Sequence, residues 1–316
     1  QSTIRPMLTA TNSLEQIRLL KTQRQPIYAL AHWTIHTDYL DFSQVTTEIL
    51  KARDILNKQK KPDTSQSHDD LAATVDTSSG RYPILVGWGI IKNLGRQVEA
   101  LISPSVVYIV IDEGVRHQSK QVQTSLESVG IKTQVFVVPS GEQIKTLETA
   151  SQIYKWLAQC NAERGHLIAA IGGGVVGDLV GFVAATYLRG MRLIQIPTTL
   201  LAMTDSSIGG KVAVNLSQGK NLVGSFHQPQ FVLTDISILE SLPKRELVSG
   251  WAEAIKHGFI LDPGLVDVFK KHAEALMNVE PEISTEVIRR SMAIKADVVG
   301  QDERETLGIR IMLNYG

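Results

Sequence analysis

The stretch Leu167-Ile168-Ala169-Ala170-Ile171-Gly172-Gly173-Gly174-Val175-Val176-Gly177-Asp178 decides the fold of this chain. It opens with a continuous apolar run, which is typical of a strand buried on both faces of a parallel sheet. Glycines follow directly and lead into a helix-like segment. Such a turn lets the backbone approach a pyrophosphate, whose charge is met by free N–H groups at the helix start. The spacing differs from the usual dinucleotide fingerprint, so a tight turn without ligand, with Asp178 as a helix cap, is the alternative.

Short β-branched runs recur on both sides of this stretch, and helix-length amphipathic segments separate most of them. They cover residues 83–86, 106–111, 134–138, 193–196 and 231–233. Strands that alternate with helices predict an α/β fold with a parallel sheet covered on both faces. The strands stop near residue 240, and we predict an all-α domain over residues 241–316. Ligands are expected at the seam between this domain and the α/β domain at residues 81–240.

Two helices are predicted in the C-terminal domain. One opens at Pro243 and is expected to end near Gly258, with proline just inside the start and glycine just past the end. The second carries apolar residues spaced four and seven apart, at Ile283, Val287, Ile294 and Val298.

The N-terminal part has a different composition. Residues 1–56 show apolar residues at helical spacing and predict a short helical extension. Residues 57–80 are rich in Lys, Ser, Thr and Asp and nearly free of large apolar side chains, which predicts an interdomain linker.

Composition excludes several classes of protein. The 316 residues contain 32 Lys and Arg against 32 Asp and Glu, so a strongly basic nucleic-acid binder or a polybasic membrane-surface protein is not expected. A single cysteine, Cys160, excludes an intrachain disulfide framework and a multi-cysteine metal site. The most apolar segment, residues 175–187, is too short to span a membrane and carries Asp178. We therefore predict a cytoplasmic protein with no nucleic-acid or membrane partner.

Polar residues gather after the next predicted strand. Its end is followed by Thr198 and Thr199, and then by the run Asp205-Ser206-Ser207-Ile208-Gly209-Gly210-Lys211. The carboxyl ends of parallel strands are where such folds bind ligands. Arg189, Lys211 and Lys220, with Asn221 as a neutral donor, are predicted to form a basic pocket for a phosphate. Solvated surface charges are the alternative.

The helix behind Pro243 carries Glu253, Lys256 and His257. Glu253 and Lys256 are three apart and share a face, so a surface ion pair is one interpretation. Glu253 and His257 are four apart, as two metal ligands on one helix would be. We favour the interpretation that His257 complements the dipole at the helix C-terminus. Arg310 and Asn314 are also four apart and are expected to face one pocket.

Several ordered motifs make residues 81–316 resemble the 3-dehydroquinate synthase family. They include Ser140-Gly141-Glu142-Gln143-Ile144-Lys145, the glycine turn, Tyr187-Leu188-Arg189-Gly190, the run from Asp205 to Lys211, Lys220-Asn221, Phe226-His227-Gln228-Pro229, Gly250-Trp251-Ala252-Glu253-Ala254-Ile255-Lys256-His257-Gly258, Asp302-Glu303-Arg304-Glu305 and Leu313-Asn314-Tyr315-Gly316. The resemblance implies a homodimeric enzyme that uses NAD and zinc or cobalt. Its substrate would be the small phosphorylated sugar acid 3-deoxy-D-arabino-heptulosonate 7-phosphate. Transient oxidation, phosphate elimination, reduction and an aldol closure would give 3-dehydroquinate.

The resemblance also implies roles for individual residues. NAD would be held by Asp112, Glu142, Lys145, Gly173, Gly174, Val175, Val176, Gly177, Asp178, Thr198, Thr199, Lys211 and Lys220. Substrate and its phosphate would be held by Arg189, Lys211, Asn221, Lys256, Lys295, Arg310 and Asn314, with Asp205 near the reacting hydroxyl. Glu253 would be a metal ligand, which suits zinc because a carboxylate with imidazoles can acidify a bound hydroxyl.

The sequence departs from the family pattern in two places. His257 stands where the family usually has an aromatic residue, which disfavours a ligand role. The family's two histidine ligands would follow Gly316, where this sequence stops, so we expect a fragment or a truncated form with weak metal binding and impaired catalysis.

Residues 1–56 carry a weaker resemblance to the C-terminal part of shikimate kinase. The resemblance is carried by Arg5-Pro6-Met7-Leu8, by Arg24-Gln25-Pro26-Ile27-Tyr28 and by the last helix. It implies that Arg5 would belong to the lid and that Arg24 would contact shikimate. We therefore expect part of a fusion of the two enzymes; an unrelated helical extension is the alternative. For the synthase region the alternatives are another sugar-phosphate cyclase, a polyol dehydrogenase of similar two-domain build, or a protein that binds NAD without catalysis.

Overall fold

A seven-stranded sheet forms the centre of the molecule. The computed structural model describes residues 70–314 and, before them, residues 15, 18, 22, 41 and 43–47. The strand order is β1-β2-β9-β6-β5-β3-β4, and every pair except β1–β2 is parallel. The strands are β1 (Leu71–Thr77), β2 (Gly80–Gly87), β3 (Val106–Asp112), β4 (Lys132–Val138), β5 (Leu167–Gly172), β6 (Arg192–Pro197) and β9 (Phe231–Asp235). The six predicted strands are thereby confirmed.

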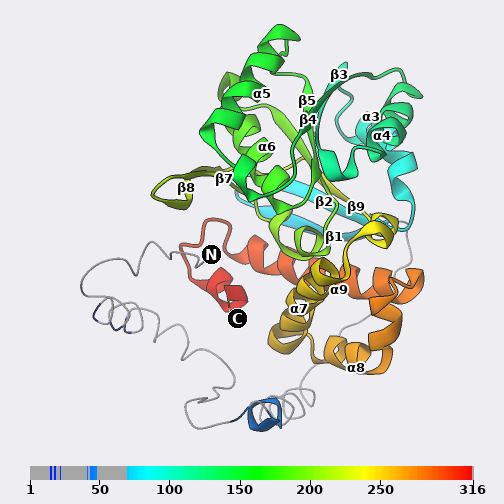
Figure 1. The fold of residues 1–316 in the computed structure, drawn as a ribbon, viewed down its shortest axis with the longest axis vertical. Coiled ribbons are helices and arrows are strands. Elements are labelled where there is room, and N and C mark those ends of the chain that lie inside the picture. Colours follow the sequence, from blue (N-terminus) through cyan, green and yellow to red (C-terminus); the bar gives the residue numbers. More distant parts are fainter. Residues whose placement is uncertain are drawn as a thin grey trace.

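Helices cover both faces of the sheet, because the central strands are apolar on both sides. All six residues of β5 are buried. Helices α3 (Leu94–Leu101) and α4 (Gln118–Glu127) pack on one face, and α5 (Leu147–Gln159) and α6 (Gly174–Thr186) on the other (Figure 1). This arrangement confirms the predicted α/β class and brings the carboxyl ends of the parallel strands to one edge.

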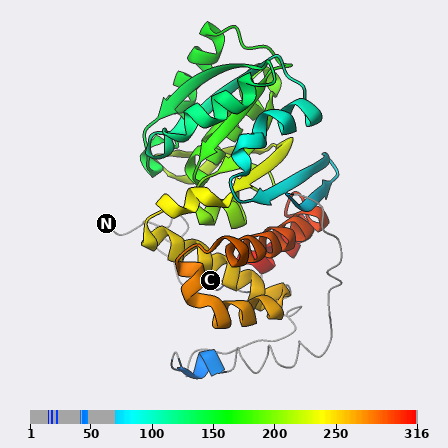
Figure 2. The same ribbon diagram turned by 90° about the vertical axis from the view of Figure 1, so that its right-hand side faces the viewer.

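Three helices form a second layer below the sheet (Figure 2). They are α7 (Lys244–Leu261), α8 (Pro263–Met277) and α9 (Pro281–Gln301). Their apolar sides share one core with β1 and β2, in which Val75 and Tyr82 contact helix residues such as Trp251 and Met292. The predicted all-α part therefore packs against the edge of the sheet that carries β1 and β2.

The linker predicted over residues 57–80 is wrong for residues 71–80. Residues 71–77 are strand β1, whose Val75 pairs with Tyr82 of β2 and is fully buried. The polar composition misled because β1 is an edge strand with its other side chains largely exposed or half-buried. Residues 57–69 lie outside the described residues, and so does most of the predicted helical extension. Within it, residues 43–47 are helical, and Asp41 and Gln44 bond each other's backbone N–H groups at 2.8 and 2.9 Å.

The helical part also differs from the prediction in detail. Helix α7 runs three residues beyond Gly258, and α8 was not predicted at all. A Cβ on Gly258 would lie 3.0 Å from Val266 Cγ2 of α8, so this glycine permits a close helix crossing and does not end the helix. The helical part also contains short 3-10 helices, and one of them, η8 (Ile309–Asn314), carries Arg310.

A two-stranded hairpin was also missed. Strands β7 (Lys211–Leu216) and β8 (Gly219–Phe226) pair antiparallel and project beside α6 (Figure 1). None of the described helices is both long and apolar enough to cross a membrane.

Candidate active site

The glycine turn has the geometry of an anion-binding helix start. Gly173 is the N-cap of α6, and no side chain caps this end of the helix. A Cβ on Gly173 would lie 3.1 Å from Thr199 Cγ2, and one on Gly174 would lie 2.8 Å from Ser206 Oγ. The turn therefore lies against the segment that follows β6, and its N–H groups are free of side-chain partners. Asp178 does not cap the helix, so the cap role considered for it is wrong, whereas the alternative of a turn without ligand is not decided by this geometry.

The remaining residues of the glycine turn differ in burial. Val175 is half-buried, and Val176 is fully buried. Gly177 packs on β6, where Gln195 Nε2 donates to its carbonyl oxygen at 3.1 Å. Thr198 is buried, and its N–H donates to Gly172 O at 3.0 Å.

Lys145 joins three elements at this edge of the sheet. Its Nζ lies 2.5 Å from Asp178 Oδ2 and 2.5 Å from Asn221 Oδ1, so it ties α6 to the hairpin. Glu142 accepts from Asn215 Nδ2 at 2.8 Å and pairs with Lys220 Nζ at 3.3 Å. Burial raises the pKa of Asp178 to about 6 although Lys145 favours its charged form. Four residues predicted to hold NAD thus form two ion pairs, Lys145 with Asp178 and Lys220 with Glu142, and both pairs contact the hairpin.

Asp112 completes this edge at the end of β3. Its Oδ1 accepts from Gly114 N at 2.8 Å and from the Ser140 hydroxyl. A Cβ on Gly172 would lie 3.2 Å from the Asp112 Cβ, so Asp112 is adjacent to the glycine turn.

Asp205 is held by the helical part. It lies on η6 (Ala202–Ser206), one turn of π-helix, a form that is frequent at functional sites. Lys295 Nζ of α9 donates to Asp205 Oδ1 at 2.5 Å. Burial by itself would raise the pKa of Asp205, but the positive charges of Lys295 and Lys256 hold it below its ordinary value. The carboxylate is therefore ionised between the two layers.

Glu253, on α7, lies close enough to the Asp205 carboxylate for the two charges to interact. Its Oε1 is 2.6 Å from Lys256 Nζ and 3.3 Å from His257 Nε2, although neither contact has good hydrogen-bond geometry among the described residues. Burial opposes ionisation of Glu253, but His257 and Lys256 hold its pKa below the ordinary value. His257 is fully buried, and its Nδ1 lies 2.7 Å from Ser291 Oγ of α9. The predicted role of His257 at a helix C-terminus is therefore wrong, because α7 continues past it.

Arg310 lies at the other end of the same seam. Its Nη1 donates to Glu303 O at 2.7 Å and to Gly209 O at 3.3 Å, and its side chain is almost fully buried. Gly209 N in turn donates to Tyr82 Oη at 3.1 Å. Lys211, half-exposed, forms an ion pair with Glu305.

Two predicted substrate residues are not joined to this cluster. Arg189 follows α6, a 13-residue helix and so about 20 Å long, which separates it from the glycine turn. Its side chain is exposed and makes no hydrogen bond or ion pair with a residue that the structure describes. Asn314 lies on η8, but its side chain is outside the described atoms.

Sequence reasoning missed three polar residues of the seam: Ser206, Asn215 and Glu305. Ser206 and Glu305 stood inside quoted motifs, but nothing in the sequence showed which neighbours they contact. Asn215 lies on the hairpin that the sequence did not reveal.

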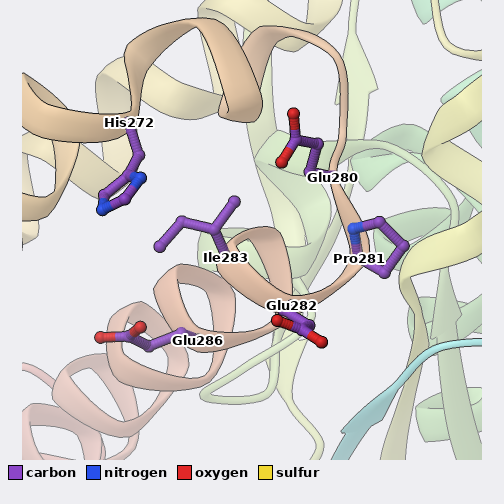
Figure 3. Close-up of a pocket in the computed structure, with 6 residues that line it drawn as sticks. All are labelled: His272, Glu280, Pro281, Glu282, Ile283 and Glu286. Carbon is purple, nitrogen blue, oxygen red and sulfur yellow. The ribbon is translucent and has the colours of Figure 1, made fainter.

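The hollow in Figure 3 lies apart from this seam, at the junction of α8 and α9. It measures about 470 Å³ and is lined by His272, Glu280, Pro281, Glu282, Ile283 and Glu286. None of the predicted site residues lines it, and its acidic groups do not meet as a possible metal site in the described part of the chain.

Family models match the chain on both sides of the seam. The model described as 3-dehydroquinate synthase N-terminal covers residues 135–249, and the one described as 3-dehydroquinate synthase C-terminal covers residues 250–316. The chain belongs to the 3-dehydroquinate synthase family. The 3-dehydroquinate synthase of Desulforamulus reducens is 45% identical over 243 residues, which are 77% of this chain and 67% of that protein. The chain therefore spans about two thirds of this curated relative.

Solved structures of two other synthases are also similar to this member of the family. A 2-deoxy-scyllo-inosose synthase has a TM-score of 0.68 at 27% identity and covers 77% of this chain and 67% of its own. ValA, a 2-epi-5-epi-valiolone synthase from Streptomyces hygroscopicus solved with NAD⁺ and Zn²⁺, has a TM-score of 0.65 at 26% identity and covers 78% and 66%. The two-domain α/β build is thus shared across the group.

Proposed function

We propose that this chain acts as a 3-dehydroquinate synthase, which converts 3-deoxy-D-arabino-heptulosonate 7-phosphate to 3-dehydroquinate and phosphate. One observation carries the proposal in a chain of this family. The uncapped start of α6 and the charged groups Asp205, Lys211, Lys295 and Arg310 lie along a single seam between sheet and helices. A dinucleotide and a sugar acid with two anionic groups need such a pair of neighbouring surfaces.

The residues at the glycine turn fit NAD. The first N–H groups of α6 have no side-chain cap, and Gly173 and Gly174 present no Cβ toward Thr199 and Ser206. When bound, NAD supplies a hydride acceptor that is restored within each turnover. We assign Glu142, Lys145, Asp178 and Lys220 to holding it, supported by their contacts at the same edge.

We assign residues to substrate binding by their charge and their hydrogen-bonding groups. Lys211, Lys295 and Arg310 are cations suited to the phosphate and carboxylate of the ligand. Oδ1 of Asn221 accepts from Lys145, which leaves its amide N–H groups for a ligand oxygen. Asp205, held ionised by Lys295 and Lys256, is suited to accept a hydrogen bond from the hydroxyl that is oxidised and to receive its proton.

The described residues supply only part of the ligand set that a catalytic zinc or cobalt ion needs. Glu253 has the chemistry of a metal ligand, because its buried carboxylate Oε1 lacks a well-formed hydrogen bond. A catalytic zinc needs three protein ligands, and no three His, Cys, Asp or Glu side chains meet in the described residues. We therefore derive no step through a metal, and we propose that the 316 residues alone bind zinc or cobalt weakly and turn over slowly. Calorimetry with zinc tests this, and ordinary tight binding would contradict it.

The activity is tested by phosphate release. We expect the chain, with NAD and zinc or cobalt, to release phosphate from the heptulosonate phosphate without net formation of NADH. The rate should exceed that of the Asp205→Asn variant. Phosphate release only from another sugar phosphate would instead support a different synthase activity. The names of the two similar solved structures favour that alternative. The 45% identity to a 3-dehydroquinate synthase favours the heptulosonate phosphate as the substrate. Net accumulation of NADH would indicate a polyol dehydrogenase.

We further propose that the chain forms a homodimer. The support is the hairpin, because β8 pairs only with β7 among the described strands and exposes Leu222 and Phe226. Light scattering on the purified chain tests the proposal, and a monomer at micromolar concentration would refute it. A fusion with shikimate kinase and a cytoplasmic location stay predictions, since most of residues 1–56 lies outside the described part.

A further inference from the structure

Glu305 lies between two cations to which the proposed function assigns the substrate's anionic groups. Its Oε1 forms an ion pair with Lys211 Nζ and lies 3.9 Å from Arg310 Nε. The two cations come from different layers: Lys211 begins β7, and Arg310 lies on η8 of the helical part. One carboxylate therefore bridges the seam at this end.

The guanidinium of Arg310 has a donor that is available to an anion. Backbone oxygens of Gly209 and Glu303 hold its Nη1, but Nε is buried and has no hydrogen-bond partner among the described atoms. Gly209 has φ of +99°, and a Cβ there would lie 2.5 Å from Arg310 Nη2, so the guanidinium fills the space beside this glycine. Of the charged neighbours, the carboxylate of Glu305 stabilises the buried guanidinium most. An ionised guanidinium this deeply buried requires such a counter-charge.

The segment that carries Glu305 is held in an unfavourable backbone conformation. Glu305 has φ of +57°, which L-residues other than glycine seldom adopt. Two residues on, the side chain of Leu307 is 68% exposed. The segment is anchored on both sides, by Glu303 to Ser78 Oγ at 2.5 Å and by Asp302 to the backbone of residues 307–310. The backbone at Glu305 itself is held only by a long hydrogen bond from Glu305 N to Asp302 O, at 3.4 Å. The Glu305 side chain rests on its contacts with the two cations.

We propose that Glu305 is the resident counter-ion of the substrate-anion site. In the free protein its carboxylate takes the place between Lys211 and Arg310 that an anionic group of the ligand takes on binding. The inference rests on the proposed function, which assigns these cations to the substrate. Binding then exchanges one anion for another, so the two cations face a negative group in both states, and Glu305 moves out toward solvent from its strained position. The affinity of the site is thereby set by a competing carboxylate of the chain itself.

Inorganic phosphate is the probe for this competition. The rise in melting temperature of the full chain with phosphate concentration gives a dissociation constant, because a ligand that binds only the folded state stabilises it. We expect Glu305→Gln to bind phosphate about three- to tenfold more tightly than the wild type at low salt, as loss of a partly exposed competing ion pair predicts. Glu305→Ala should change in the same direction, which covers the case that one variant folds poorly.

Glu286→Gln is the matched control. It changes the net charge equally and also removes an ion pair, between Glu286 Oε1 and Arg290 Nη1 at 3.0 Å, but it lies near the start of α9 beside the hollow of Figure 3. Its phosphate affinity should equal that of the wild type. In the double variant Glu305→Gln with Lys211→Met, the gain from the first change should disappear, since the competed cation is gone.

Unchanged or weaker phosphate binding in Glu305→Gln would overturn the inference, because Glu305 would then not compete for the site. An equal gain in Glu286→Gln would overturn it as well, since the effect would be one of net charge. The proposed function fails by a different result: a gain in Glu305→Gln with no turnover of the heptulosonate phosphate would refute the activity and leave the competition intact.

Discussion

The ammonium group of Lys295 lies 2.5 Å from Oδ1 of Asp205 and so connects α9 to the π-helical turn behind β6. The side chain of Lys295 is only 10% exposed and that of Asp205 is 38% exposed, so the ion pair is shielded from solvent on the lysine side. It joins the two layers at the point where the proposed chemistry takes place.

Replacing Lys295 by Met should raise the pKa of Asp205, because Lys295 is the strongest of the positive charges that hold it down. The acidic limb of the pH profile of kcat/KM then moves to higher pH, and kcat/KM above that limb falls by about 100-fold through loss of a substrate cation. Lys244→Met, at an exposed position of α7, is the control and should leave both unchanged. An acidic limb that stays in place would show that Lys295 does not set the ionisation of Asp205.

Asp178 provides a prediction about stability and pH. Its pKa is raised from 3.8 to about 6 in the folded chain, so the folded state binds its proton more tightly than the unfolded state does. The resulting stabilisation is present below pH 3.8 and is lost as the pH rises through 6; a shift of this size corresponds to about 3 kcal/mol. The melting temperature of the wild type relative to Asp178→Asn should therefore fall between pH 4 and 6. A relative melting temperature that rises over this interval would contradict the assignment.

Gly174→Ala should weaken binding of NAD by about tenfold, since each 1.4 kcal/mol of lost interaction is a factor of ten. The added Cβ would lie 2.8 Å from Ser206 Oγ and push the segment behind β6 away from the glycine turn. Calorimetry with NAD measures the change. Gly165→Ala is the matched control, because nothing lies within 4 Å of a Cβ there. Equal affinities for the two variants would mean that the turn does not contact the cofactor.

Gly258→Val should destabilise the fold by about 1–3 kcal/mol through overpacking at the crossing of α7 and α8. A Cβ already lies 3.0 Å from Val266 Cγ2, so the two further methyl groups have no room. Urea unfolding measures the effect. Ala252→Val tests the helix-propensity cost alone at an exposed position of the same helix, and it should cost less than 1 kcal/mol. A similar loss in both variants would argue against a tight crossing.

The α/β part was predictable because its signals are local. The run from Leu167 to Ile171 is apolar without interruption and is followed by glycines, so its strand, turn and helix follow from residues next to one another. The edge strand β1 was not predictable in this way, since only Val75 of its seven residues is buried. The hairpin of β7 and β8 was hidden for the same reason: most residues of β8 are exposed, and no alternation of apolar side chains marks it.

The sequence alone determined the chemistry that the chain can offer: a glycine turn, a set of lysines and arginines, and carboxylates at Asp205 and Glu253. Tertiary structure decided which of these groups meet. It paired Lys295 with Asp205 across 90 residues and Lys211 with Glu305 across 94, and it left Arg189 at the far end of α6. The physical reason is that charge pairing depends on distances of a few ångströms between separate elements, and those distances are set by how the helices pack on the sheet. The neutral net charge of the chain is thus an average over a seam in which each cation has its own carboxylate or carbonyl partner.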